Sequence, residues 1–187
     1  MTTPAICEEA FGCGCAGFTH LFNAMPPLHH REPGPALALL EDPRVTVELI
    51  ADGVHLHPAV VRSVIDAVGP DRVALVTDAV AAAGSADGSF QLGTVPVDLV
   101  SGVARVRGTS AIAGSTATMD QLFRTAAGLG LNGDVGLAAA VRMTSATPAR
   151  TLRLDQVGSL RPGYDANLVV LDLDLQVTAA IVNGDWR

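Results

Sequence analysis

Apolar runs that end in polar residues occur three times in the first half of the chain, with helical segments between them. Apolar and β-branched content predicts strands over Phe18–Phe22, Val45–Ala51 and Val73–Thr77. Predicted helices end at Cys15, run from Glu32–Pro35 through Leu40, and run from Pro58 through Val68, because proline is accepted in a first helical turn. Strands that alternate with helices in this way are typical of a parallel sheet in an α/β protein.

The pattern changes after Gly84. Glycines and short alternating runs predict hairpin strands over Phe90–Leu92, Val95–Leu99 and Val103–Arg107. Helices are predicted over Thr116–Leu129, over Val135–Met143 and from Thr147 onward. The tail, Gly158–Asp172 and Val177–Gly184, is expected to form strands and turns.

His20 lies near the end of the first predicted parallel strand, and His55 and Asp78 come shortly after the second and third. Parallel α/β barrels build their active sites at this edge, from groups on several strands. Two histidines and an aspartate there indicate metal-assisted hydrolysis, because imidazole binds transition metals and a carboxylate can take a proton from water. Two alternatives stay open: His20 could bond to the backbone at its strand end, and Asp78 could cap a following helix.

Composition narrows the classes of partner. Of the 187 residues, 49% are hydrophobic and the mean hydropathy is +0.36, which suits a packed core rather than disorder. The net charge of −7 and the pI near 5.0 argue against nucleic acid or an anionic membrane as partner. Any anionic substrate must therefore be met by a few local cations.

The N-terminal segment and the cysteines indicate a cytoplasmic protein. Met1–Glu9 lacks the basic and apolar regions of a signal peptide, and no uncharged apolar run is long enough to span a bilayer. Cys7, Cys13 and Cys15 are expected to be ordinary reduced residues, because no second cysteine pair completes a metal motif.

Five segments carry a recognisable pattern. They are THLFNAMPPLHHREPG (Thr19–Gly34), ELIADGVHLHP (Glu48–Pro58), VALVTDA (Val73–Ala79), AIAGSTATMDQ (Ala111–Gln121) and GSLRPGYDANLVVLD (Gly158–Asp172). Together they resemble the C-terminal half of N-acetylglucosamine-6-phosphate deacetylases, within the amidohydrolase superfamily. The resemblance implies an α/β fold with the last three strands of a TIM-type (β/α)8 barrel in residues 1–150. Residues 151–187 would then be C-terminal strands of an accessory β-sandwich.

The resemblance also implies roles for individual residues. His20 matches a metal ligand at the end of the sixth barrel strand, and Asp78 matches the catalytic aspartate at the end of the eighth. His55 and Arg31 match contacts to the phosphate and sugar, with Arg31 reaching the site of a neighbouring subunit in a homodimer; the alternative for Arg31 is a solvated loop charge. Further matched substrate contacts are Asn23, Ala24, Ile112, Ala113, Gly114 and Ser115. The last four are expected to form a turn that opens a helix, whose N–H groups favour oxygen-rich ligands.

The implied reaction is the metal-dependent hydrolysis of N-acetylglucosamine 6-phosphate to glucosamine 6-phosphate and acetate. The cofactor would be a divalent metal, zinc or another transition metal such as iron. A barrel takes about 250 residues, and two further ligands of the family, a glutamate and a histidine on earlier strands, have no counterpart here. We therefore expect a truncated chain that is inactive alone, the alternative being a non-catalytic fragment or the complementing half of a split amidohydrolase. A different amidohydrolase substrate is disfavoured by the THLFNAM and REPG segments.

Overall fold

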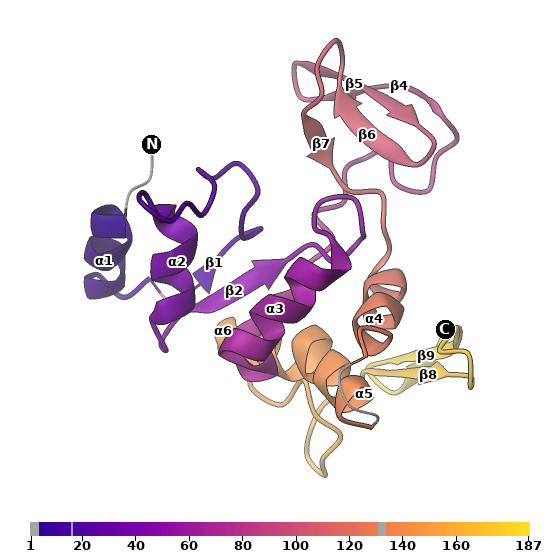
Figure 1. Cartoon of the computed structure of the whole chain (residues 1–187). Helices are drawn as coiled ribbons and strands as arrows, with labels where there is room; N and C mark the ends of the chain where they lie inside the picture. The colour runs from indigo at the N-terminus through magenta and orange to yellow at the C-terminus, as the bar shows by residue number, and fades with distance from the viewer. Residues whose placement is uncertain (1–3, 16, 131–133) are drawn as a thin grey trace.

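The structure, a computed structural model, describes residues 4–15, 17–130 and 134–187. Its centre is a parallel sheet in the order β1–β2–β3 (Figure 1). The elements of this part are α1 (Pro4–Gly12), β1 (Gly17–Phe18), α2 (Gly34–Glu41), β2 (Thr46–Leu49), α3 (Pro58–Val68), the 3-10 turn η1 (Pro70–Arg72) and β3 (Val73–Leu75). The predicted α/β character and the three parallel strands are confirmed, although each strand ends earlier than predicted. The sequence predicted that Met1–Glu9 is not a signal peptide; residues 1–3 of this segment lie outside the described residues.

The central strand β2 and helix α3 organise the main core. Val47 and Leu49 of β2 are fully buried. Helix α3 turns Val61, Val64 and Ile65 inward, and their spacing of three and four residues places them on one face. Burial of this face against the sheet orients the loop between β2 and α3.

His57, for which the sequence indicated no role, caps the start of α3. Its Nδ1 accepts a hydrogen bond from the backbone N–H of Ala59 at 3.2 Å, which satisfies one of the free amides of the first turn. Pro58 follows at the first helical position, where its missing N–H costs nothing. The helix ends at Gly69, whose φ of +77° suits a residue without a Cβ.

An antiparallel sheet in the order β4–β5–β6–β7 follows β3 before any α-helix. Its strands are β4 (Gly88–Leu92), β5 (Val95–Val100), β6 (Val103–Val106) and β7 (Ile112–Gly114). The predicted hairpin strands are confirmed, and the sheet projects from the body of the molecule in Figure 1. It has a small core of its own, formed by Ala82, Val97, Leu99 and Ala104.

The expectation that Ile112–Ser115 forms a turn opening a helix is wrong. Ile112 and Gly114 pair instead with Arg105 and Ala104 of β6, so their backbone groups are used by the sheet. The next helix begins only at Met119.

The second half of the body is helical. Its elements are α4 (Met119–Ala127), α5 (Asp134–Val141), the π-helical turn η2 (Arg142–Ala146) and α6 (Thr147–Thr151). Helix α4 begins three residues later than predicted, because Thr118 takes the capping position and its N–H donates to Oε1 of Gln121 at 3.0 Å.

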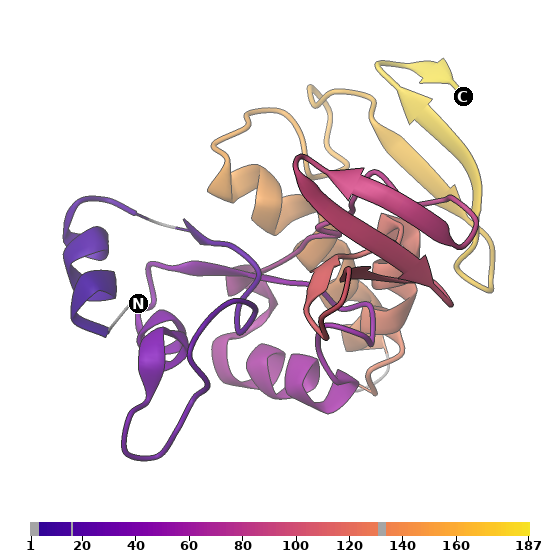
Figure 2. The same cartoon turned by 90° about the horizontal axis from the view of Figure 1, so that it is seen from above.

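The C-terminal segment forms a third, antiparallel sheet in the order β10–β9–β8. Its strands are β8 (Leu168–Leu171), β9 (Val177–Val182) and β10 (Asp185–Trp186), as the strand-and-turn pattern predicted. Leu171 and Leu175 pack against the main core, and Arg124 of α4 donates a hydrogen bond to the carbonyl oxygen of Leu175 at 3.2 Å. Figures 1 and 2 show this sheet on the opposite side of the molecule from α1 and α2.

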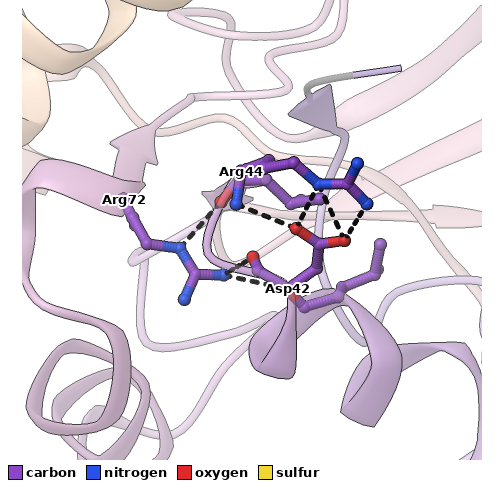
Figure 3. A network of polar contacts seen from close by, with 5 residues as sticks. Asp42, Arg44 and Arg72 are labelled. Atoms are coloured by element: carbon purple, nitrogen blue, oxygen red, sulfur yellow. Dashed lines mark hydrogen bonds and ion pairs between the residues drawn. The ribbon is translucent and has the colours of Figure 1, made fainter. Parts of the chain in front are cut away.

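Arg72 joins α2 to the sheet at the end away from the predicted site (Figure 3). Its guanidinium donates to the carbonyl oxygens of Leu39, Leu40, Asp42 and Val45 at 2.5–3.1 Å. The first three are carbonyls at the C-terminus of α2, which have no partner within the helix. One half-buried cation thus ends α2 and sets the start of β2.

Asp42 receives a second arginine on its side chain. The guanidinium of Arg44 bonds both carboxylate oxygens of Asp42, and these hydrogen bonds lower the pKa of Asp42 to about 2. Burial lowers the pKa of Arg72 from its ordinary value, and the charge of Asp42 offsets part of that effect.

Candidate active site at the ends of three parallel strands

The structure brings the loops that follow β1, β2 and β3 to one edge of the parallel sheet. Backbone pairing continues beyond the strands. The N–H of Leu21 donates to the carbonyl oxygen of Glu48 at 2.8 Å, and the N–H of Val76 donates to the carbonyl oxygen of Leu49 at 3.1 Å. His20, the segment from Asp52 to His55, and Asp78 therefore follow neighbouring strand ends on the same side.

His20 lies in a strained bend two residues after β1. Its φ is +36°, and Phe22 and Ala24 in the same bend have φ values of +73° and +53°. Non-glycine residues in this region cost conformational energy and concentrate at functional segments. Nδ1 of His20 is buried and has no hydrogen-bond partner in the described part of the chain. A buried, unpaired imidazole nitrogen is a group that a ligand could satisfy.

Asn23 and Ala24 occupy the same bend. The side-chain amide of Asn23 donates to the carbonyl oxygen of Leu21 at 3.2 Å, which orders the loop from within. Ala24 is exposed.

Asp78 also has a left-handed backbone, with a φ of +50°. Its backbone is held where the chain returns from β7: the N–H of Ser115 donates to the carbonyl oxygen of Asp78 at 2.8 Å. Asp78 is exposed and no helix follows it directly, so the alternative that it caps a helix is wrong. The capping position of the next α-helix, α4, belongs to Thr118.

Gly114 packs against this bend more closely than a side chain would allow. An added Cβ would lie 2.6 Å from Cγ1 of Val80 and 2.9 Å from the carbonyl oxygen of Asp78, and the φ of Gly114 is +134°. Glycine at this position permits the close approach of the two chain segments.

His55 forms a buried pair with Asp52. Nδ1 of His55 and Oδ2 of Asp52 are 2.7 Å apart, and the two side chains are 5% and 7% exposed. Oδ1 of Asp52 accepts from the N–H groups of Val54 and His55 at 2.9 and 2.8 Å. Burial raises the pKa of Asp52, but the hydrogen bonds from His55 and from the two amides outweigh it, so the pKa is lowered overall.

A cavity of about 150 Å³ lies between this loop and the β4–β7 sheet. His55, Gly114 and Ser115 are the predicted site residues that line it. Asp52 lines it as well, although the sequence reasoning assigned Asp52 no role. Its position three residues before His55 was the available signal, because an aspartate at that spacing can bond back to a following imidazole.

The other predicted residues lie outside this cavity. They are His20, Asn23, Ala24, Arg31, Asp78, Ile112 and Ala113. Arg31 is exposed on the loop before α2, and its backbone N–H donates to Nδ1 of His29 at 3.3 Å. Arg31 therefore lies outside the cavity that His55 lines.

Within residues 4–15, 17–130 and 134–187, no group of three or more histidine, cysteine, aspartate or glutamate side chains could hold a metal ion. Cys7, Cys13 and Cys15 are free, as expected. No α-helix in the described part of the chain combines the length and apolar character that crossing a bilayer requires.

Comparison with known proteins gives consistent matches. Residues 3–187 match the amidohydrolase family. N-acetylgalactosamine-6-phosphate deacetylase of Escherichia coli O157:H7 is 42% identical over 178 residues, which are 95% of this chain and 46% of that protein. A protein of E. coli K12, whose name provisionally assigns the same activity, is 43% identical over 166 residues, which are 88% of this chain and 96% of that protein.

Among solved structures, a mutant N-acetyl-D-glucosamine-6-phosphate deacetylase from Mycobacterium smegmatis, in complex with N-acetyl-D-glucosamine-6-phosphate, matches with a TM-score of 0.95. It is 52% identical, and the match covers 99% of this chain and 49% of that chain. This chain thus spans about half the length of the O157:H7 relative and of the mycobacterial enzyme.

Proposed function

The chain belongs to the amidohydrolase family, and from this premise we propose that it carries the substrate-binding and proton-transfer part of a deacetylase acting on 2-acetamido sugar 6-phosphates. The observation that carries the proposal is the position of Asp78. Its strained backbone, tied to Ser115, lies at the same sheet edge as His20 and the Asp52–His55 pair. Such an edge is where parallel α/β enzymes hold their reacting groups.

In the proposed reaction, water adds to the acetyl carbonyl and the amide C–N bond breaks, giving acetate and the free amine. The Asp78 carboxylate takes a proton from the attacking water and delivers it to the leaving nitrogen. Its exposure beside a strained turn gives it access to substrate. His55 and the β7 segment, Ile112 to Ser115, would contact the sugar phosphate, together with Asn23 and Ala24 from the bend after β1.

A divalent metal, zinc or another transition metal such as iron, is part of the proposal. When bound, such a metal lowers the pKa of water and polarises a carbonyl group. The buried, unpaired Nδ1 shows that the His20 ring has hydrogen-bonding capacity left over, and imidazole suits these metals. His20 fits as one ligand, and the other ligands would come from outside the described residues of this chain.

We further propose that β1, β2 and β3 are the last three strands of a (β/α)8 barrel within residues 1–150. Residues 151–187 would be strands of a β-sandwich, and the full assembly would be a homodimer. The parallel order of β1–β3 is compatible with a part of a barrel. The exposed position of Arg31 is compatible with a contact to a second subunit. A cytoplasmic location belongs to the same proposal, because charged sugar phosphates do not cross membranes.

The substrate we propose is N-acetylglucosamine 6-phosphate, since the mycobacterial structure that shares 52% identity is named for it. N-acetylgalactosamine 6-phosphate is the second candidate, because the E. coli O157:H7 relative is named for that sugar. The two sugars differ only in the orientation of one hydroxyl group, so a direct comparison of rates separates them.

A different function, as a non-catalytic chain or as the complementing half of a split enzyme, is favoured by one observation. The described residues lack a cluster of three metal-binding side chains. In that case the chain alone would bind sugar phosphate and release no acetate.

A chimera tests the proposal. This chain would replace the matching half of the mycobacterial deacetylase, and acetate release from both 2-acetamido sugar 6-phosphates would be measured with zinc bound. We expect turnover, faster on N-acetylglucosamine 6-phosphate. A folded chimera that holds zinc but releases acetate from neither sugar contradicts the proposed function.

A further inference from the structure

Asp52 makes one more hydrogen bond, to the side chain of His55, than is required to hold the backbone of the loop after β2. Two backbone hydrogen bonds to Oδ1 of Asp52 already fix the turn through Val54 and His55. The second carboxylate oxygen is then aimed at Nδ1 of His55 at 2.7 Å. Both side chains are almost wholly buried, so this contact has little competition from water.

The contact decides which ring nitrogen carries the proton. An ionised carboxylate has no proton to donate, so Nδ1 of His55 must donate and holds a hydrogen. The net lowering of the Asp52 pKa agrees with an ionised carboxylate at neutral pH. Nε2 of His55 makes no hydrogen bond to any described residue, and His55 lines the cavity below the β4–β7 sheet.

We propose that Asp52 is a positioning residue: it keeps a proton on Nδ1 of His55 and turns Nε2 toward the cavity, where Nε2, once it is protonated as well, donates to a phosphate oxygen of the sugar phosphate. The choice of a sugar phosphate as ligand rests on the proposed function. The assignment of the proton to Nδ1 of His55 does not. Carboxylates that bond the far nitrogen of a working histidine orient the ring and raise its basicity. When Nε2 also takes a proton, the Asp52 carboxylate balances the charge and Nε2 donates to the anionic oxygen.

The cavity suits this role. Apart from His55, its lining includes no histidine, arginine or lysine, so His55 is its candidate cation. The residues from Gly114 to Ala117 line the same cavity. A space of about 150 Å³ admits a small polar group such as a phosphate.

The variant Asp52→Asn tests the positioning role. The amide oxygen can keep the two backbone hydrogen bonds, which turns its NH2 group toward Nδ1 of His55. Nδ1 must then accept, and the proton moves to Nε2. Nitrogen NMR spectra of the histidine rings in the full chain distinguish the two forms directly.

We expect the Nδ1–H signature of His55 in the wild-type chain and the Nε2–H signature in Asp52→Asn, with backbone amide spectra that remain dispersed. Asp66→Asn, which removes the same charge from the exposed face of α3, should leave the ring of His55 unchanged. An Nε2–H signature in the wild type, or the same signature in both chains, overturns the inference without touching the proposed deacetylase activity.

Binding of glucosamine 6-phosphate, followed by calorimetry, tests the ligand. We expect its affinity to fall roughly tenfold in Asp52→Asn, because Nε2 then donates from a neutral ring instead of a cationic ring balanced by Asp52, and charge-assisted hydrogen bonds are about twice as strong as neutral ones. In His55→Gln, which leaves the turn at Asp52 in place, the affinity should fall by as much. In Asp66→Asn the affinity should not change. Unchanged affinity in both Asp52→Asn and His55→Gln, despite the altered ring, would show that this cavity does not hold the phosphate.

Discussion

The backbone N–H of Ser115 donates a hydrogen bond to the carbonyl oxygen of Asp78 at 2.8 Å, although the two residues are separated by the whole β4–β7 sheet. The carbonyl oxygen of Ser115 in turn accepts from Val80 at 3.0 Å, which makes a short parallel bridge between Ala79 and Ser115. The return of the chain from β7 thus clamps the turn that carries the candidate catalytic carboxylate. The sheet inserted after β3 supports the site as well as covering its cavity.

Replacing Gly114 should disturb this clamp. In Gly114→Ala the new Cβ would meet Val80 and the Asp78 carbonyl oxygen at less than 3.0 Å, on a backbone with positive φ. We expect a loss of about 2–4 kcal/mol in the free energy of unfolding, from overpacking and from backbone strain together. Urea unfolding of the wild-type and variant chains measures this difference in the free energy of unfolding.

The matched control is Gly93→Ala in the turn between β4 and β5. Gly93 also has a positive φ, +59°, but an added Cβ meets nothing within 4 Å. It should cost only the backbone strain, about 1–2 kcal/mol. Equal losses in the two variants would mean that close packing at Gly114 contributes nothing.

Removing the guanidinium of Arg72 should destabilise the chain strongly. Arg72→Met leaves four carbonyl oxygens without their donor, three of them at the end of α2. At about 1–3 kcal/mol for each buried group left unsatisfied, we expect at least about 3 kcal/mol after partial rescue by water. The control Arg62→Met removes an exposed ion pair with Asp66 and should change stability by less than about 1 kcal/mol. Similar urea midpoints for the two variants would contradict the role of Arg72 in ending α2.

Asp78→Asn should remove proton transfer in the mycobacterial chimera. The amide keeps the shape of the carboxylate but cannot accept the proton of water, so the rate of acetate release should fall by about a hundred- to ten-thousand-fold. Bound zinc, measured by elemental analysis, should stay near the parent value. Asp155→Asn, on the exposed surface, should change neither quantity. An Asp78→Asn chimera that keeps its rate would exclude Asp78 as the base.

Arg31→Ala should act on the phosphate and not on the chemistry. Its exposed position outside the cavity fits a role in a neighbouring subunit, where its planar group can bind two phosphate oxygens. In the dimeric chimera we expect a higher KM for N-acetylglucosamine 6-phosphate, a similar kcat, and little change for unphosphorylated N-acetylglucosamine. Arg153→Ala serves as the exposed control. Equal losses on the two sugars would indicate a structural role for Arg31.

Zinc should bind the isolated chain weakly. His20 offers one imidazole, and the described residues include no set of three ligands. Calorimetric titration should show no tight, stoichiometric phase, in the wild type or in the surface control His30→Ala. Tight binding that disappears in His20→Ala would mean that residues of this chain complete the site after all.

Several features of the fold could be predicted from local sequence. The bounds of α3 follow from Pro58, Gly69 and the spacing of Val61, Val64 and Ile65, because proline, glycine and apolar periodicity act within a few residues. The hairpin strands β4–β6 were recognisable for the same reason. The candidate residues His20, His55 and Asp78 were found because each follows an apolar run, and motif resemblance supplied their proposed roles.

Other features depend on partners far away in the chain. Ile112–Gly114 has the local character of a turn, but β6 offers its backbone a ladder, and pairing makes it a strand. Asp52 had only its spacing from His55 as a local signal, and its role depends on the fold, which closes the loop after β2 and buries both side chains. The sequence by itself determined most of the elements and the chemical groups at the strand ends, because those depend on short-range propensity and side-chain type. Only the tertiary structure decided which groups meet, as with Asp78 and Ser115, because hydrogen bonds and burial depend on distance in space.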